Sequence, residues 1–122
     1  MSGRTVYTAL EEAASRFGDR PALMQPVPGT NGEQFATTTW NQFAQIAREI
    51  ACGLRSLGIQ RGDVVALQSE TRAEFFFADM GILANGSIAA ALYTSYPQGE
   101  AIKKLRNCGA KLVFVENPKM LA

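Results

Sequence analysis

Residues 54–67, LRSLGIQRGDVVAL, contain the end of a helix, a turn and the start of a strand. Gly58 is a natural left-handed residue after a helix, and Ile59 stands where a Schellman motif places an apolar side chain. Residues 60–63 then turn the chain into residues 64–67, a run that is apolar without alternation. Because this strand has no polar face, we expect both of its faces to be buried, as in a parallel sheet.

The helix that precedes this turn has the strongest pattern in the chain. Residues 39–42 have the spacing of a capping box, which predicts a helix that opens at Thr39. Its apolar side chains fall on one stripe: Phe43, Ile46, Ala47, Ile50, Leu54 and Leu57. We therefore expect a helix as far as Gly58 that packs one face on the core.

A helix and a hairpin are predicted before residue 39. Residues 5–17 place apolar side chains on one face and stop at Gly18, a second candidate for a left-handed residue after a helix. Two strand candidates, residues 21–25 and 34–38, flank a loop rich in proline, glycine and asparagine. This order predicts a hairpin over residues 21–38.

Two further helix–strand pairs are predicted after the first strand. The capping-box spacing of residues 71–74 predicts a helix that opens at Thr71 and is apolar nearly all round, followed by residues 88–93 as a second buried strand. Such a helix is either central to its domain or covered by something outside this sequence. A fourth helix is expected from Ser95, with Pro97 in its first turn, to Gly109.

The expected fold class is α/β. Residues 112–115 form the third apolar strand, and residues 117–122 have the pattern of the first turn of another helix. Three buried strands joined by two helices make a βαβαβ parallel sheet with flanking helices when the crossovers are right-handed. The 122 residues then form one subdomain: helix–strand repeats over residues 39–116, with the N-terminal helix and the β-hairpin at the edge of the sheet.

Composition excludes several function classes. Twelve Lys and Arg against eleven Asp and Glu give a formal net charge of +1 without charged blocks, so no nucleic-acid partner is expected. The chain has no histidine, which removes imidazole bases, Ser-His-Asp and Cys-His catalysis and His-containing metal sites. We therefore expect no metal site in this chain.

The number of cysteines and the length of the apolar stretches indicate the cellular compartment. Cys52 and Cys108 are too few for a disulfide framework or a four-ligand zinc site. The N-terminus lacks a secretory pattern, and Asp79 and Asn85 interrupt the longest apolar stretch, residues 75–93. No transmembrane segment is predicted, and the expected location is the cytoplasm.

Candidate site residues lie where ligands of open α/β sheets bind, at the carboxyl ends of the strands. Three loops occupy such ends: residues 68–71, 93–96 and 116–117. The loop at residues 93–96 carries several hydroxyl groups, and its candidate cleft residues are Tyr93, Thr94 and Ser95. Ser95 serves equally well as a helix cap, and Tyr96 as the residue before Pro97, so a structural interpretation stands beside the functional one.

Other chemistry-bearing residues also have two interpretations. Glu70 and Glu74 can be paired carboxylates, although a Glu at a helix start more often stabilises the helix dipole. Cys52 falls on the polar side of its helix without a base to activate it, and Cys108 is expected to be a small buried side chain. The three phenylalanines at residues 75–77 can line an acyl-chain pocket or belong to the core.

No phosphate-binding loop is found. Residues 68–71, which follow the first strand, lack the glycines of a dinucleotide fingerprint, and no Walker A sequence occurs. We therefore expect no cofactor to be bound by these residues alone.

Particular residues also stand in an order typical of one family. They are Thr39-Trp40 with Phe43 and Ala47, Ala51-Cys52-Gly53-Leu54 with Leu57-Gly58-Ile59, residues 61–67, residues 76–83 before Ala84-Asn85-Gly86, and Gly109-Ala110-Lys111. In these the chain resembles, over nearly its whole length, the N-terminal part of the adenylate-forming enzymes: acyl-CoA synthetases, luciferases and peptide-synthetase adenylation domains. Tyr93-x-Ser95-x-Pro97 and residues 100–102 are similar to the long-chain fatty acid–CoA ligase branch.

The resemblance implies a parent enzyme that uses ATP and Mg²⁺ to convert a carboxylate into an acyl-adenylate and then transfers the acyl group to CoA. It places the phosphate loop, the nucleotide-binding residues and the catalytic lysine later in such enzymes, so no catalytic or cofactor-binding residue is carried over. The chain is then an inactive N-terminal scaffold fragment whose partner is the remainder of the same enzyme, with fatty acid, ATP and CoA as substrates of the whole. A peripheral membrane association stays open for the full-length enzyme, and the isolated chain is expected to self-associate through apolar surface.

The alternative comes from another class of protein. It is a small stand-alone α/β module that binds a ligand or a protein at residues 93–96 without catalysis.

Overall fold

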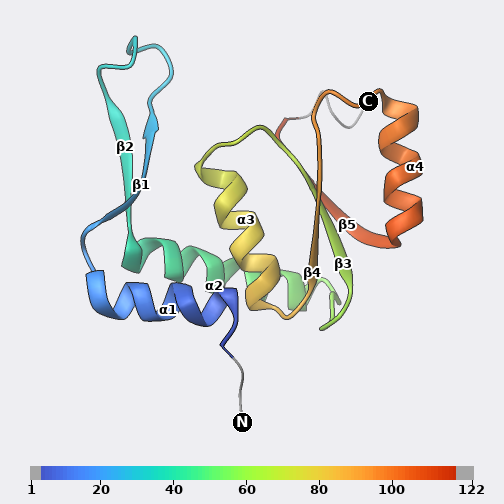
Figure 1. Ribbon diagram of the computed structural model, residues 1–122, viewed down its shortest axis with the longest axis horizontal. Helices are drawn as coiled ribbons and strands as arrows, with labels where there is room; N and C mark the ends of the chain where they lie inside the picture. The colour runs from blue at the N-terminus through green and yellow to red at the C-terminus, as the bar shows by residue number, and fades with distance from the viewer. Residues whose placement is uncertain (1–3, 118–122) are drawn as a thin grey trace.

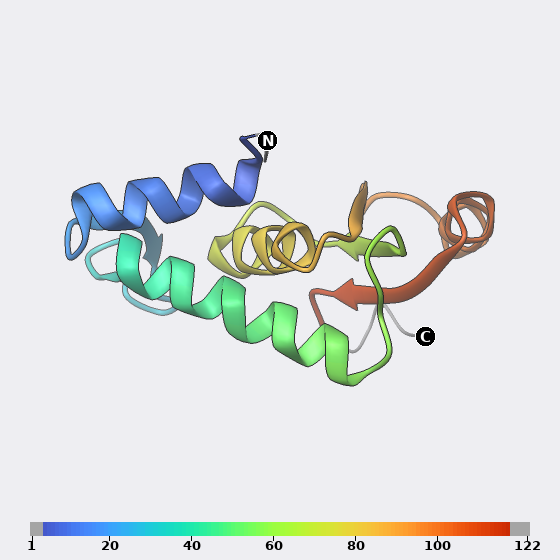
Figure 2. The same ribbon diagram turned by 90° about the horizontal axis from the view of Figure 1, so that it is seen from below.

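A computed structural model describes residues 4–117 of the chain. The described residues contain four helices and five strands in the order α1 (Val6–Phe17), β1 (Pro21–Pro26), β2 (Phe35–Thr39), α2 (Trp40–Ser56), β3 (Val64–Gln68), α3 (Ala73–Ala84), β4 (Ile88–Leu92), α4 (Gln98–Cys108) and β5 (Ala110–Val115). The expected α/β fold class is confirmed. Figures 1 and 2 show α1, α2 and α3 together on one side of the parallel sheet and α4 on the other.

The parallel sheet has the order β4-β3-β5, with β3 in the centre. In its register Val65 stands opposite Ala89 on one side and Leu112 on the other. β3 is buried as expected, but β4 is not: Ile88 is 53% exposed and Ala91 is exposed. The expectation of a buried second strand is wrong because, within residues 4–117, no strand pairs with the outer side of β4, and α4 packs against β5 instead.

The hairpin over residues 21–38 is confirmed, and its strands pair antiparallel. Its expected place at the edge of the parallel sheet is wrong, since β1 and β2 form a separate two-stranded sheet. The reason lies in the inward side chains of β1: Ala22 and Leu23 pack on the helix layer. The hairpin therefore projects from the helices, as Figure 1 shows.

Two clusters of buried side chains hold the helices and the sheet together. The first lies between α1 and α2 and contains Leu10, Ala14, Phe43, Ala44 and Ala47. The second joins α2, β3 and α3 through Leu54, Ile59, Val65 and Ile82. Where α3 crosses α2, Gly81 allows a close approach, because a Cβ there would lie 2.3 Å from Ile50 Cγ2.

The predicted ends of α2 are confirmed. Thr39 Oγ1 accepts the Gln42 N–H (3.1 Å), and Gln42 Oε1 accepts the Thr39 N–H (2.9 Å), which completes the capping box. At the other end the Ile59 N–H donates to Leu54 O (3.0 Å), and Gly58 has φ +88°. This is the predicted Schellman motif, with Ile59 buried beside it.

The predicted caps of α3 and α4 are wrong. The N-cap of α3 is Arg72 rather than Thr71, and no side chain of the helix caps it. The N-cap of α4 is Pro97 rather than Ser95. A proline disfavours helical backbone in the residue before it, so α4 begins only after Pro97, and the Ser95 hydroxyl stands too far upstream to cap it.

Helix α4 is less covered than expected. Ala101 is buried, but Ile102 is 42% exposed, and Cys108 is exposed, so the prediction of a buried Cys108 is wrong. The cause is that α4 packs mainly on β5 and its far side faces away from the rest of the molecule (Figure 2). Cys52 is exposed on α2, as expected.

The last predicted helical turn begins at the described Asn117, but residues 118–122 lie outside the described part of the chain. None of the helices within residues 4–117 is long and apolar enough to cross a membrane.

Candidate functional site

Gln68, at the end of β3, joins the three strand-end loops. Its Nε2 donates to Tyr93 O (3.0 Å), which ties β3 to the end of β4. Its backbone carbonyl accepts the Glu116 N–H (3.2 Å), which ties β3 to the end of β5. The three loops singled out in the sequence therefore lie together at one edge of the sheet.

The tyrosine pocket is a cleft of about 600 Å³ at this edge. It is lined by Ser69, Glu70, Thr71, Phe75, Ala91, Leu92, Tyr93, Thr94, Ser95 and Tyr96. The rings of Tyr93 and Tyr96 meet edge to face with centroids 5.5 Å apart, and Lys104 Nζ lies 4.8 Å from the centre of the Tyr96 ring. The structure thus brings the candidate residues Tyr93, Thr94 and Ser95 together along one cleft.

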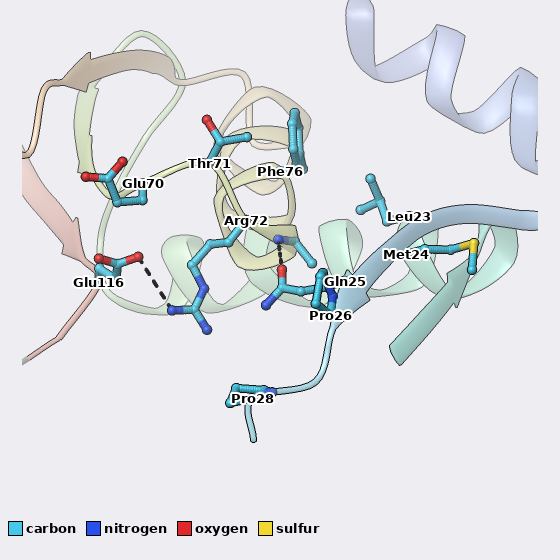
Figure 3. A pocket seen from close by; sticks show the side chains of 11 residues that line it. Leu23, Met24, Gln25, Pro26, Pro28, Glu70, Thr71, Arg72, Phe76 and Glu116 are labelled. Atoms are coloured by element: carbon cyan, nitrogen blue, oxygen red, sulfur yellow. Dashed lines mark hydrogen bonds and ion pairs between the residues drawn. The ribbon is translucent and has the colours of Figure 1, made fainter. Parts of the chain in front are cut away.

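The hairpin pocket adjoins it and measures about 490 Å³. One wall comes from the hairpin: Leu23, Met24, Gln25, Pro26 and Pro28. The other wall comes from the N-cap residue Arg72, from Ala73 and Phe76 of α3, and from Glu116. Glu70 and Thr71 line both pockets. Figure 3 shows Gln25 turned toward the start of α3 and Arg72 reaching toward Glu116. The pocket is therefore built from segments far apart in the sequence.

Arg72 is the positively charged residue of the hairpin pocket, and acidic side chains bind it. Its Nε donates to Glu74 Oε2 (2.7 Å), and its Nη1 lies 3.5 Å from Glu116 Oε1. The hydrogen bond from Arg72 holds the pKa of the Glu74 carboxyl below its usual range, and the same bond raises the pKa of Arg72. The guanidinium is thus engaged by carboxylates on both sides.

Glu70 and Glu74 do not act on each other as a pair of carboxylates. Glu74 binds Arg72, whereas Glu70 accepts a hydrogen bond from the Thr94 hydroxyl. Of the two, only Glu74 lies in the first turn of α3, so it alone fits the helix-dipole interpretation.

The residues at this edge do not fit a phosphate group. The N–H of Ala73, at the start of α3, is bonded to Gln25 Oε1, so this helix end does not offer that donor to an anion. Residues 68–72 contain no glycine, and Glu70 and Glu116 add negative charge to the lining. Within residues 4–117 no group of three or more Cys, Asp or Glu is placed to hold a metal ion. The arrangement suits an apolar or hydroxyl-bearing ligand better than a nucleotide.

Sequence reasoning missed the residues that organise this edge. Gln68 has a local signal, since it is the polar residue that ends an otherwise apolar strand. Gln25 has none, because its role depends on β1 lying beside α3.

The model of the AMP-binding enzyme family matches residues 10–122. The chain belongs to the AMP-binding enzyme family. The resemblance to adenylate-forming enzymes drawn from the sequence is thereby confirmed.

Relatives in this family include several ligases. The chain is 33% identical over 111 residues to 4-coumarate–CoA ligase 1 of Petroselinum crispum, covering 91% of this chain and 19% of the ligase. It is 29% identical over 117 residues to a long-chain-fatty-acid–CoA ligase of Xenopus laevis, covering 96% and 15%. An uncharacterized protein of Mycobacterium tuberculosis is 32% identical over 124 residues, covering 95% and 69%. The chain spans about a fifth of the length of the plant ligase.

Solved structures of other proteins have the same fold. The N-terminal subdomain of Klebsiella oxytoca NpsA, in complex with 3-hydroxyanthranilyl-AMSN, matches with a TM-score of 0.82 at 20% identity, over 96% of this chain and 28% of that one. The anthranilate CoA ligase AuaEII, in complex with anthranoyl-AMP, matches with a TM-score of 0.79 at 25% identity, over 92% and 20%. The fold is that of the N-terminal subdomains of adenylate-forming enzymes.

Proposed function

We propose that the chain is the N-terminal scaffold of a larger AMP-forming ligase that activates a fatty acid with ATP and transfers it to CoA. The observation that carries this proposal is the chemistry of the strand-end cleft. The cleft lies where α/β sheets bind ligands. However, the backbone N–H at the start of α3 is already bonded to Gln25, and the guanidinium of Arg72 is already bound by Glu74 and Glu116. In this proposal another part of the enzyme binds ATP, and these residues provide walls and support.

The acyl group is proposed to contact the tyrosine pocket. Phe75, Leu92 and the two tyrosines give it apolar surface, while Thr94 and Ser95 add hydroxyl groups. The long-chain-fatty-acid–CoA ligase of Xenopus laevis supports a fatty acid as substrate, whereas the plant relatives are ligases of 4-coumarate. The two substrate classes therefore have to be compared directly.

The test starts from the native polypeptide. An antibody against the 122 residues is used to measure its mass in the source cells and to purify it. ATP–pyrophosphate exchange is then measured with palmitate and with 4-coumarate, on this polypeptide and on the 122-residue chain.

We expect a polypeptide several times heavier than 13.2 kDa that exchanges pyrophosphate with palmitate, and no exchange by the chain alone. Exchange with 4-coumarate but not palmitate would overturn the fatty-acid part. Exchange by the 122 residues alone would overturn the scaffold role.

A second candidate function is a stand-alone binding module that uses the tyrosine pocket without catalysis. The observation that favours it is the Mycobacterium tuberculosis relative, of which this chain covers 69%, so a short protein can be built on this unit. A native polypeptide near 13.2 kDa that binds a fatty acid without consuming ATP would establish this candidate instead.

A further inference from the structure

The chain contains two Asn-Gly pairs, Asn31-Gly32 and Asn85-Gly86, in opposite surroundings. Asparagine is a chemically labile residue. It loses its side-chain amide without an enzyme when the backbone nitrogen of the next residue attacks its Cγ, and a following glycine hinders this attack least. The reaction needs an amide side chain that is free to turn and a backbone nitrogen that no hydrogen bond holds.

Asn31 and Gly32 are the central residues of the turn at the tip of the hairpin. The Glu33 N–H donates to Thr30 O (2.9 Å), and φ is positive at both central residues, +53° at Asn31 and +77° at Gly32. Positive φ at both positions is typical of a type I′ turn, in which Asn-Gly is a preferred pair. The turn therefore explains why these two residue types occur here.

The Asn31-Gly32 pair is open to the reaction. Both residues are exposed, and Figure 1 shows the hairpin loop away from the helices. Neither the Asn31 side chain nor the Gly32 N–H makes a hydrogen bond with any residue of the described range 4–117. A Cβ at Gly32 would meet nothing within 4 Å, so no neighbour crowds the attacking nitrogen.

The Asn85-Gly86 pair is closed to the reaction. Asn85 is 3% exposed, and both its side-chain nitrogen and its side-chain oxygen make hydrogen bonds to other segments. The Gly86 N–H donates to Leu83 O (3.0 Å), and a Cβ at Gly86 would lie 3.0 Å from Arg61 Cγ. The attacking nitrogen and the amide that it would attack are therefore both held in place.

We propose that Asn31 is a site of spontaneous deamidation in the folded protein, whereas Asn85 is protected by the fold. The Gly32 nitrogen gives its proton to hydroxide and bonds to Asn31 Cγ, and the Cγ–Nδ2 bond breaks. The released nitrogen takes up a proton and leaves as ammonia. Water then opens the cyclic imide at either of its carbonyl carbons, which leaves aspartate or isoaspartate at position 31.

The product changes the charge of the hairpin loop and leaves the core untouched. A new carboxylate stands two residues before Glu33, and the formal net charge of the chain falls by one from +1. The loop contributes no side chain to either cluster of buried residues, so the fold is expected to stay the same. The site therefore gives the molecule a slow change of charge with age.

The test follows both pairs in the native polypeptide. The protein is incubated at neutral and at mildly alkaline pH in water labelled with a heavy oxygen isotope, and the peptides that contain each pair are analysed by mass spectrometry. An isoaspartate-specific carboxyl methyltransferase gives a second readout. We expect isotope incorporation at position 31, faster at alkaline pH because hydroxide takes up the proton, and several-fold slower incorporation at position 85.

Two controls separate the effect of the structure from that of the sequence. In a denaturing concentration of urea neither pair has a fixed structure, so the two rates are expected to become similar. Asn31→Gln is the matched variant, because it keeps an uncharged amide but closes the ring far more slowly through its longer side chain. Its loop peptide should incorporate no isotope over the same time.

Two outcomes would contradict the proposal. Incorporation at position 31 no faster than at position 85 in the folded protein would overturn it. A preference for position 31 that persists unchanged in urea would mean that neighbouring sequence sets the rates, and would overturn the protection of Asn85 by the fold. Neither outcome depends on the mass or the activity of the native polypeptide, so the proposed function is tested separately.

Discussion

Gln25 caps a helix that begins 48 residues later in the sequence: its Oε1 accepts the backbone N–H of Ala73, the first residue of α3. Since α3 has no cap from its own side chains, the hairpin fixes where the helix starts. The same contact holds the wall of the hairpin pocket against α3.

Replacing Gln25 with alanine is expected to lower the free energy of unfolding by about 1 kcal/mol, the usual effect of losing a helix cap. Urea denaturation measures the loss, and hydrogen exchange should show faster exchange of the Ala73 amide. Gln34→Ala is the control, since Gln34 is an exposed residue of the same hairpin. Equal losses in the two variants would mean that the cap does not stabilise α3.

Replacing each of two glycines in neighbouring helices with alanine should change the free energy of unfolding in opposite directions. Gly81→Ala is expected to lower the free energy of unfolding by about 1–3 kcal/mol through overpacking, because the new Cβ meets Ile50. Gly53→Ala on α2 should raise it by about 0.5–1 kcal/mol, since a Cβ there meets nothing within 4 Å. Chemical denaturation of the two variants checks the signs, and a stabilised Gly81→Ala would contradict the close helix contact.

Asn85 connects three segments at the other end of the molecule. Its Nδ2 donates to Ile59 O (3.2 Å) and to Ser87 Oγ (2.8 Å), and its Oδ1 accepts from Arg55 Nε (2.6 Å). Asn85→Ala removes the donor of Ile59 O and the acceptor of Arg55 Nε, while Ser87 Oγ keeps its bond to Gln60 O, and the expected loss is about 2–3 kcal/mol of unfolding free energy. Urea denaturation against Asn107→Ala, an exposed position on α4, separates this loss from a general effect of removing an asparagine.

Asp63 gives the stability a dependence on acid pH. The Gln60 N–H (2.7 Å), and secondly Lys111 Nζ (3.1 Å), hold the pKa of its carboxyl below the ordinary 3.8. A lowered pKa in the folded state contributes stability that is present above pH 3.8 and is lost as the pH falls through the folded value.

We therefore expect Asp63→Asn to lower Tm at neutral pH and to flatten the fall of Tm at acid pH. Lys111→Gln should do the same to a smaller extent, because it removes only the second cause. Thermal unfolding followed over pH checks both variants. If the Tm of Asp63→Asn fell at acid pH as steeply as that of the unchanged protein, another carboxyl group would be the cause of that fall.

The sequence predicts elements whose determinants lie within a few residues. The capping box of Thr39 and Gln42 and the Schellman motif at Gly58 are local, and both occur. The cap predicted for α3 at Thr71 fails because a residue from another element, Gln25, bonds the helix start. Local spacing cannot report a partner 48 positions away.

The candidate site follows the same division. That the strand-end loops meet could be predicted, because parallel strands share their carboxyl edge, and Gln68 does join them. The ion pair between Arg72 and Glu116 could not be predicted, since it depends on β5 lying next to β3. The exposure of β4 and of Cys108 could not be predicted either, because an apolar stretch of sequence does not show how many strands or helices will cover it.

The central place of β3 has a consequence for biosynthesis. β4 joins one side of β3 and β5 the other, and of the strands within residues 4–117 β5 is the last to be made. A chain that folds as it leaves the ribosome can pair β3 with β4 early, while the other edge of its most buried strand stays open. Until residues 110–115 emerge, the open edge of β3 is therefore able to pair with a strand of another chain.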